Sequence, residues 1–356
     1  MGEKVCPGFS FAQRGFWMKK YLFSYLSSFL IFCFLSCNQT FAGGSGQSFE
    51  ESSTTAVSFS CWNAQTFFDS EIEGTEYSDY QNLAKWSKDK YLTRLSRLCE
   101  VMTALNSDII VLEEIENAAV MQDIANQFAG NVWESKGNWS YACFSKEEGS
   151  AIGCGVFSKY ELCDLKVHTL NIQTQSEAQP STRPLLQVTA LINDKTLVIF
   201  VNHWKSKVSG EGSGEIWRDW QENLLAEKII ELQKKNVDFS CVLCGDFNRD
   251  IREFVSGMTG NGENVLFRGI DEKLELYSPW YNSYGDYSTE TGSYFYDGEW
   301  ERIDHIFVTG NIKFSAFSPR SDSPWAASNS VPNAYKLYSG EGYSDHLPLT
   351  GILTLF

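Results

Sequence analysis

The feature that most constrains this chain is an apolar run that ends in a pair of polar side chains. Residues 239–244 are mostly apolar, which is the pattern of a buried strand. Gly245 ends the run, and Asp246 and Asn248 follow it. Residues two apart in an extended segment share one face, so both side chains can face the same cleft. Because α/β proteins place their chemistry at strand ends, we predict a functional site here.

Several other apolar runs also lead into polar clusters. The chain has only four histidines, and three of them lie in such clusters. One histidine alone is often structural, but many polar strand ends together indicate a shared site. Neighbours in a strand point to opposite faces, so His305, beside Asp304, is interpreted as structural. The clusters are Trp62-Asn63 after the run 57–61, 113–117 after 109–112, 202–207 after 197–201, Asp304-His305 inside 303–308, and Asp345-His346 near the C-terminus.

Helical and strand patterns alternate along the chain, which predicts an α/β fold. Leu92, Leu95, Leu98, Met102 and Leu105 form an apolar stripe at helical spacing. Further helices are predicted at 117–128 and 216–232. Short strands are predicted at 152–158 and 185–192, in addition to the apolar runs above.

Taken in order, the polar motifs WN, EEIEN, NHWKSK, GDFN, RIDH and SDH resemble those of the endonuclease/exonuclease/phosphatase superfamily. The resemblance runs from about Val57 to the C-terminus. NHWKSK and the aromatic-rich approach to RIDH are most similar to the branch of secreted bacterial nucleases. The resemblance implies a four-layer α/β sandwich, in which two mixed sheets pack face to face with helices outside. It also implies a metal-dependent phosphoesterase.

A metal site is implied by the same resemblance. Glu114 matches the family's main metal ligand, with Asn63 beside it, and a carboxylate oxygen suits Mg²⁺. Mn²⁺ and Ca²⁺ are the alternative ions. Asp345 is interpreted as a support for the metal or for a histidine. Glu113 stands where the family often has glutamine, so it is the weaker candidate.

Acid–base roles are implied for five residues. Asp304 and His346 resemble the family's Asp–His pair, in which a carboxylate fixes the imidazole tautomer. His203 is the candidate general acid, or a donor to a phosphoryl oxygen. Asp246 would orient or deprotonate the attacking water, and Asn248 would hold a phosphate oxygen. The residues alone leave open which of these groups is the base.

The net charge of −16 is unfavourable for tight binding of a nucleic-acid duplex. A local patch of Arg183, Lys205 and Lys207, with Arg218, could still bind phosphate. Three functions follow: a nuclease acting on DNA or RNA, a phosphodiesterase or phosphatase acting on lipid or sugar phosphates, or an inactive binding module. The full set of catalytic residue types argues against the inactive module. The lipid anchor and the acidic charge fit the second function slightly better, and a nuclease is the first prediction. No protein partner is predicted.

The N-terminal segment has the pattern of a bacterial lipoprotein leader. Met18, Lys19 and Lys20 precede an apolar run from 21 to 36, which Cys37 follows. We therefore expect a leader at 1–36 that starts at Met18, lipidation at Cys37, a flexible tether at 37–55 and a catalytic domain at 56–356. This predicts a protein of the cell envelope that contacts the membrane through a lipid anchor; an uncleaved anchor or a secreted protein is the alternative.

Two further patterns have structural interpretations. Cys241 and Cys244 are three apart on a predicted strand and face opposite sides, so we interpret them as buried thiols. The segment 277–300 is dense in tyrosine and tryptophan. It predicts a hairpin with cross-strand aromatic pairs, or else a stacking surface beside the cleft.

Overall fold

The computed structural model describes residues 54–129, 139–174, 178–207, 214–236, 238–257 and 263–356, and the backbone of Phe16–Lys19. The predicted leader, Cys37 and almost all of the tether lie outside the described side chains. The backbone of Phe16–Lys19 forms an edge strand that pairs antiparallel with Tyr141–Ser145. Among the described helices, none is both long enough and apolar enough to cross a membrane.

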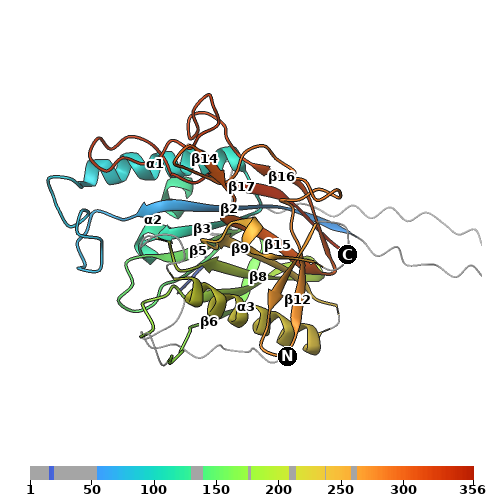
Figure 1. Cartoon of the computed structure of the whole chain (residues 1–356). Helices are drawn as coiled ribbons and strands as arrows, with labels where there is room; N and C mark the ends of the chain where they lie inside the picture. Colours follow the sequence, from blue (N-terminus) through green and yellow to red (C-terminus); the bar gives the residue numbers. More distant parts are fainter. Residues whose placement is uncertain are drawn as a thin grey trace, which may run out of the picture.

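Two large mixed sheets form the centre of the molecule (Figure 1). In spatial order the first contains β1 Phe16–Lys19, β4 Tyr141–Ser145, β5 Gly153–Ser158, β3 Ile109–Ile115, β2 Thr55–Phe67, β17 Leu349–Leu355 and β16 Ile312–Pro319. The second contains β10 Val255–Ser256, β11 Asn264–Arg268, β12 Lys273–Tyr277, β15 Asp304–Gly310, β9 Ser240–Asp246, β8 Lys195–His203, β7 Leu185–Ile192 and β6 Glu161–His168. A separate hairpin pairs β13 Tyr294–Tyr296 with β14 Glu299–Glu301.

Helices cover the outer faces of the two sheets. α1 (Lys88–Leu105) and α2 (Ala118–Ala129) lie on the first sheet, and α3 (Glu215–Lys235) lies on the second, at the opposite side of the molecule in Figure 1. The Ser87 side chain caps the start of α1, and Asn117 accepts a hydrogen bond from the Val120 N–H at the start of α2. The predicted four-layer α/β sandwich is confirmed.

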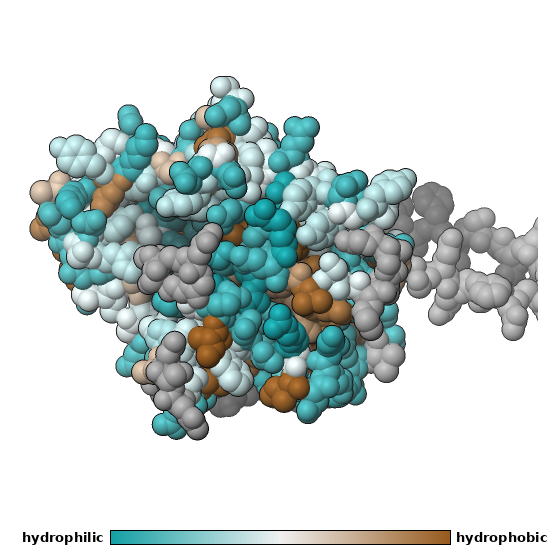
Figure 2. All heavy atoms as spheres, in the orientation of Figure 1, coloured by the Kyte–Doolittle hydropathy of each residue, from teal (hydrophilic) through white to brown (hydrophobic). Residues whose placement is uncertain are grey.

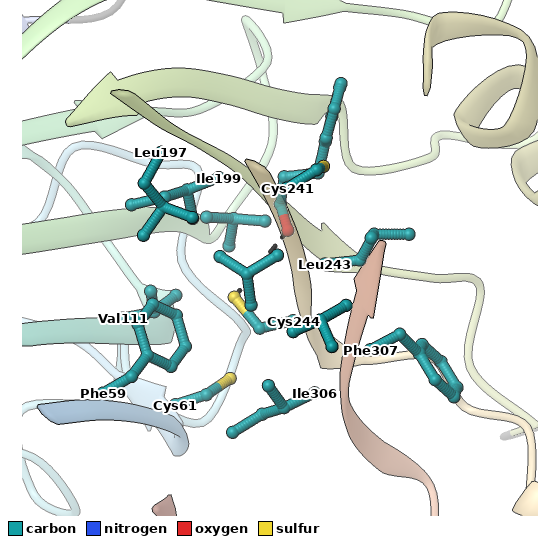
Figure 3. Close-up of a cluster of buried hydrophobic side chains, with 14 of the residues drawn as sticks. Phe59, Cys61, Val111, Leu197, Ile199, Cys241, Leu243, Cys244, Ile306 and Phe307 are labelled. Atoms are coloured by element: carbon teal, nitrogen blue, oxygen red, sulfur yellow. Dashed lines mark hydrogen bonds between the residues drawn. The ribbon is translucent and has the colours of Figure 1, made fainter. Parts of the chain in front are cut away.

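Strand alternation explains how the first sheet serves two cores. Phe59, Cys61 and Val111 point to the second sheet, whereas the side chains between them point to α1 and α2. Figure 3 shows the inner core, where Cys61 faces Cys244 and Ile306 of the opposite sheet. The seven cysteines at described positions are free. Cys241 and Cys244 are buried, as predicted.

The predicted strands and helices are confirmed, but several strands are longer than their apolar runs. β2 continues to Phe67 and β3 to Ile115. Asn63 and Glu114 therefore lie inside strands instead of after them. Both strands change register at this point, because the pairing skips residues between Asn63 and Phe67 and between Glu113 and Ile115. Such bulges re-aim side chains near functional sites.

Candidate active site

The site forms where strands of both sheets end side by side. Asp246 lies at its centre, opposite His203 of β8 in the parallel register and opposite Asp304 of β15 in the antiparallel register. Asn63 joins the two sheets, because its Nδ2 donates to Asp246 Oδ2 at 3.1 Å and to Glu114 Oε1 at 3.2 Å. Residues from five strands, β2, β3, β8, β9 and β15, therefore meet in one site.

Gly245 allows β8 and β9 to approach closely beside Asp246. Its φ is 127°, and a Cβ at this position would lie 1.9 Å from the Asn202 carbonyl oxygen. No other residue fits here without moving the backbone. Gly245 was expected to end the strand, but it lies within β9. It allows the close pairing with Asn202 that places Asp246 opposite His203.

Asp304 and His346 form the pair that the resemblance implied. The distance from His346 Nδ1 to Asp304 Oδ2 is 2.8 Å, and both side chains are buried. Burial alone would lower the pKa of His346, but the Asp304 carboxylate raises it well above its usual value. The Asp304 carboxylate thus favours the protonated form of the ring. Trp280 and Trp62 fix the backbone of the pair through indole hydrogen bonds to its two carbonyl oxygens.

His203 lies in the same site without such a bond. Its Nε2 is 3.6 Å from Glu114 Oε1 and 3.9 Å from Asp246 Oδ2, and its Nδ1 has no hydrogen-bond partner within the described residues. Burial, followed by the positive charge of Arg183, lowers the pKa of His203 well below its usual value. This ring is therefore neutral at physiological pH.

Glu114 owes its position to the bulge in β3. Its φ of 61° interrupts the alternation of the strand and turns the carboxylate to Asn63 and into the cleft. The Thr66 N–H donates to its second oxygen. Glu113 keeps the regular alternation and points between the sheets, where Cys61 Sγ lies 3.0 Å from its Oε1 and burial raises its pKa well above the usual value. Of the two glutamates, only Glu114 reaches the cleft.

The donor set fits a hard divalent cation. One ligand atom each from Asp246, Asp304 and His346 lies within 4.8 Å of the others, and Glu114 is beside Asp246 through their shared contact with Asn63. Carboxylate oxygens are the ligands that Mg²⁺, Mn²⁺ and Ca²⁺ prefer. The third residue predicted near the metal, Asp345, has an oxygen 3.9 Å from His346 Nε2, and burial raises its pKa.

A cleft of about 910 Å³ opens over these groups, and it contains only part of the predicted phosphate patch. Arg183 and Lys207 line it together with Asn248. The Lys207 ammonium lies 2.9 Å from Glu253, which offsets its charge. Lys205 was predicted in the patch, but it is not among the lining residues. Its backbone N–H donates to Gln221 and its side chain lies against Gly214.

Arg218 is also outside the cleft, contrary to the expectation for the patch. Its side chain is buried, and it pairs with Glu215 and the Lys205 carbonyl at the start of α3.

Asn248 does line the cleft, with its N–H bonded to Asp246 Oδ1 at 2.8 Å and its amide bonded to the Trp204 carbonyl at 3.2 Å. Figure 2 shows that the visible face of the molecule is mainly hydrophilic.

Sequence reasoning missed a buried arginine that supports the metal side of the site. Arg94 of α1 is fully buried and donates to the carbonyl oxygens of Ala64, Gln65 and Thr66. Gln65 and Thr66 have positive φ values of 53° and 47°, a conformation that non-glycine residues rarely adopt. The arginine therefore stabilises the turn that presents Asn63 and the Thr66 N–H to Glu114. Its position in a helical pattern gave no signal of this contact.

The aromatic segment before RIDH contains the predicted hairpin, and one face of that hairpin lines the cleft. Phe295 and Trp300 form the expected cross-strand pair, with ring centroids 5.0 Å apart. On the other face Tyr294 and Tyr296 line the cleft, and the Tyr294 ring centroid lies 4.7 Å from that of His346. The sequence placed aromatic residues near the site but could not show which face they occupy.

The sequence profile of the endonuclease/exonuclease/phosphatase family matches residues 58–318, which is most of the chain. The chain belongs to this family. Family members are hydrolytic phosphoesterases that generally require a divalent metal, and the carboxylate cluster fits that requirement. No curated protein matches the chain by sequence.

Solved structures share the fold at low identity. Truncated TDP2 of Caenorhabditis elegans is 15% identical with a TM-score of 0.51, covering 85% of this chain and 98% of that one. The human nocturnin catalytic domain, solved with a sulfate anion, is 13% identical with a TM-score of 0.52, covering 85% and 97%. A mannosyl-6-phosphatase of Bacteroides thetaiotaomicron is 14% identical with a TM-score of 0.51, covering 84% and 100%. At these identities the likeness concerns the fold.

Proposed function

We propose that the protein is a divalent-metal-dependent phosphodiester hydrolase that cleaves DNA or RNA at the cell envelope. The observation that carries the proposal is the meeting of Glu114, Asp246 and the His346–Asp304 pair in one cleft. Phosphodiester hydrolysis requires an activated water and neutralisation of charge on the phosphoryl oxygens. This cleft contains a residue type for each requirement.

The pKa shifts of Asp246, His346 and His203 indicate what each residue can do in this reaction. When bound by Glu114 and Asn63, Mg²⁺ would neutralise phosphoryl charge. Burial raises the pKa of Asp246, with Asp304 as the next cause, so its carboxylate can accept a proton from water at a higher pH than a free aspartate. Protonated His346 can donate a hydrogen bond to a phosphoryl oxygen through Nε2. Neutral His203 keeps one ring N–H, which can donate a hydrogen bond to a phosphoryl oxygen, the second of its two predicted roles.

A second candidate is a phosphodiesterase or phosphatase acting on lipid or sugar phosphates. The observation in its favour is the acidic rim of the cleft, where Asp297, Glu299 and Glu301 face the solvent side. A rim of carboxylates disfavours a long polyanion. One structural neighbour is a mannosyl-6-phosphatase, an enzyme named for a sugar phosphate.

The test is a substrate panel with the purified protein. Plasmid DNA, RNA, sphingomyelin, inositol phosphates and a hexose phosphate are each incubated with Mg²⁺, Mn²⁺ or Ca²⁺, with EDTA as the control. We expect hydrolysis of DNA or RNA that EDTA abolishes. Hydrolysis of the lipid or sugar phosphates alone would favour the second candidate. The absence of hydrolysis with all three metals would contradict the proposed chemistry.

We also propose that the mature protein is anchored by a lipid at Cys37. This rests on Met18, the two lysines after it and the apolar run before Cys37. Mass spectrometry of the membrane fraction should find an acylated cysteine at the N-terminus. An intact leader, or a soluble mature form that starts elsewhere, would contradict this proposal.

A further inference from the structure

We infer that the β13–β14 hairpin is a substrate-selecting wall of the cleft, which binds an uncharged ring with hydroxyl or amino donors next to the phosphate. The inference rests on the proposed function and concerns the ring next to the phosphate that is cleaved. The ring could belong to a nucleoside or to a sugar, because both present flat or hydroxyl-rich faces and hydrogen-bond donors.

The hairpin is fixed to the catalytic pair by backbone bonds. Tyr294 forms a β-bridge with His346, and the Leu347 N–H donates to the Ser293 carbonyl at 2.7 Å. The Asp304 N–H donates to Ser293 Oγ at 3.1 Å. The hairpin therefore holds a set distance from both members of the His346–Asp304 pair. A group bound on it would lie beside the reacting phosphate.

One face of the hairpin forms an aromatic ladder that leads away from the catalytic histidine. The rings of Tyr294 and Tyr296 are nearly parallel, at 9°, with centroids 6.2 Å apart. Tyr294 in turn packs on His346 at 4.7 Å. Tyr296 is 63% exposed although it is a large ring in a cleft wall. A stacked ring on such a platform gains roughly 5- to 150-fold in binding, whatever its sequence context.

The same hairpin carries the negative charge of the rim. Asp297, Glu299 and Glu301 line the cleft on this side. Carboxylates accept hydrogen bonds from hydroxyl and amino groups, and they repel phosphates. Lys207, the nearest lysine of the cleft lining, is already paired with Glu253. An uncharged ring thus fits this wall better than the next phosphate of a polynucleotide does.

The first test compares substrates that share a leaving group. Thymidine 5′-(p-nitrophenyl phosphate) and glucose 6-(p-nitrophenyl phosphate) carry a ring beside the phosphate, and methyl p-nitrophenyl phosphate does not. Tyr296→Ala should lower kcat/KM for a ring substrate at least about fivefold more than for the methyl substrate. Tyr338→Ala is the matched control, because Tyr338 is 89% exposed and does not line the cleft. Equal losses for ring and methyl substrates would overturn the inference.

The nucleoside and glucose arms separate the two sources of the ring. A selective loss confined to the thymidine substrate identifies a base platform, and one confined to the glucose substrate identifies a sugar platform. Either result supports the hairpin as the selecting element. Calorimetric titration with thymidine 5′-phosphate, glucose 6-phosphate and methyl phosphate gives the same comparison without turnover. A wild-type enzyme that binds the ring phosphates but hydrolyses nothing would contradict the proposed function alone.

A second test addresses the charge of the wall. Replacing Glu299 and Glu301 together by glutamine should raise the rate on duplex DNA several-fold at low salt, relative to the rate on the thymidine substrate. The gain should shrink as salt rises, because screening weakens the repulsion. An unchanged ratio at low salt would show that the rim does not discriminate against polyanions.

Discussion

A buried histidine lies beside Asp246 on each side of the cleft, yet the pKa values of the two rings are shifted in opposite directions. His346 is bonded to Asp304 at 2.8 Å, and its pKa is raised well above the usual value. His203 has carboxylate oxygens no nearer than 3.6 Å, and burial lowers its pKa. Both rings are almost fully buried, so burial does not explain the difference. The position of one carboxylate oxygen decides which ring keeps a proton.

The largest effect is expected from Glu114→Gln, which removes a charge from the His203 side of the cleft. Glutamine keeps the shape and the contact with Asn63 but is a poorer ligand for a hard cation. We expect activity to fall by more than the roughly 100-fold seen when a residue outside the metal's ligand shell is lost. Activity is measured across a Mg²⁺ titration, with circular dichroism to check the fold. Unchanged activity at the same Mg²⁺ requirement would show that Glu114 is not a ligand.

Alanine at either histidine should reduce kcat by about 10²- to 10⁴-fold, because each ring contributes a separate proton-transfer or hydrogen-bonding role. The comparison predicts different pH responses. Loss of His346 removes the ring whose protonated form Asp304 favours, whereas loss of His203 removes a ring that burial keeps neutral. The pH profile of kcat should therefore shift more in His346→Ala than in His203→Ala. Identical profiles in both variants would mean that the two rings share one role.

A smaller effect is expected from Arg94→Gln, which loosens the turn on the Glu114 side and leaves the His346 pair intact. The Mg²⁺ concentration for half-maximal activity should rise about 10- to 100-fold, with kcat recovered at high metal. Arg97→Gln is the matched control on the same helix, since Arg97 also donates to carbonyl oxygens, those of Gly340 and Gly342. If kcat falls without any change in the metal requirement, Arg94 does not position the metal side.

The smallest effect concerns a third buried histidine, His305, which resembles His203 in lacking a carboxylate bond. Its Nε2 contacts the Arg249 carbonyl oxygen, and burial lowers its pKa from 6.5 to about 4. The unfolded chain therefore binds a proton at a higher pH than the folded one. The neutral His305 ring therefore contributes about 3 kcal/mol to the free energy of unfolding. This contribution is fully present above pH 6.5 and is lost as the pH falls to 4.

Urea denaturation between pH 7.5 and 4 measures this loss. His305→Gln should flatten the pH dependence of the unfolding free energy in that window, although the variant is less stable at pH 7.5. A variant that loses stability with falling pH as steeply as the wild type would show that His305 does not carry the effect.

Much of the site could be predicted from local sequence because apolar runs place their ends at the edge of a sheet. Asn63, Glu114, His203 and Asp246 were expected near one another, and the structure brings them together. The alternation of β15 also placed Asp304 in the site and His305 outside it, where its ring packs against Phe307. These predictions depend on strand periodicity and on the order of the family's motifs along the chain, and both can be read from the sequence.

The remainder depends on contacts between distant segments. Lys205 was placed with the phosphate-binding residues, but its backbone N–H bonds to Gln221 of α3 and it is not among the residues that line the cleft. Arg94 touches a turn thirty residues earlier in the chain, and nothing in the helical pattern marks that contact. The orientation of Tyr294 and Tyr296 depends on how the hairpin docks against the His346 segment. Charge states were likewise beyond local reasoning, since a carboxylate distance fixes them.

The central claim is that Asp304 and His346 act as one unit, and a double-mutant cycle tests it most directly. kcat is measured for Asp304→Asn, His346→Ala and the double variant under saturating metal and substrate. Residues that act as a unit are strongly non-additive. The pair predicts that Asp304→Asn reproduces part of the His346→Ala loss, and that the double variant is scarcely slower than His346→Ala. If the two losses multiply fully in the double variant, the residues act independently and this account of the site is wrong.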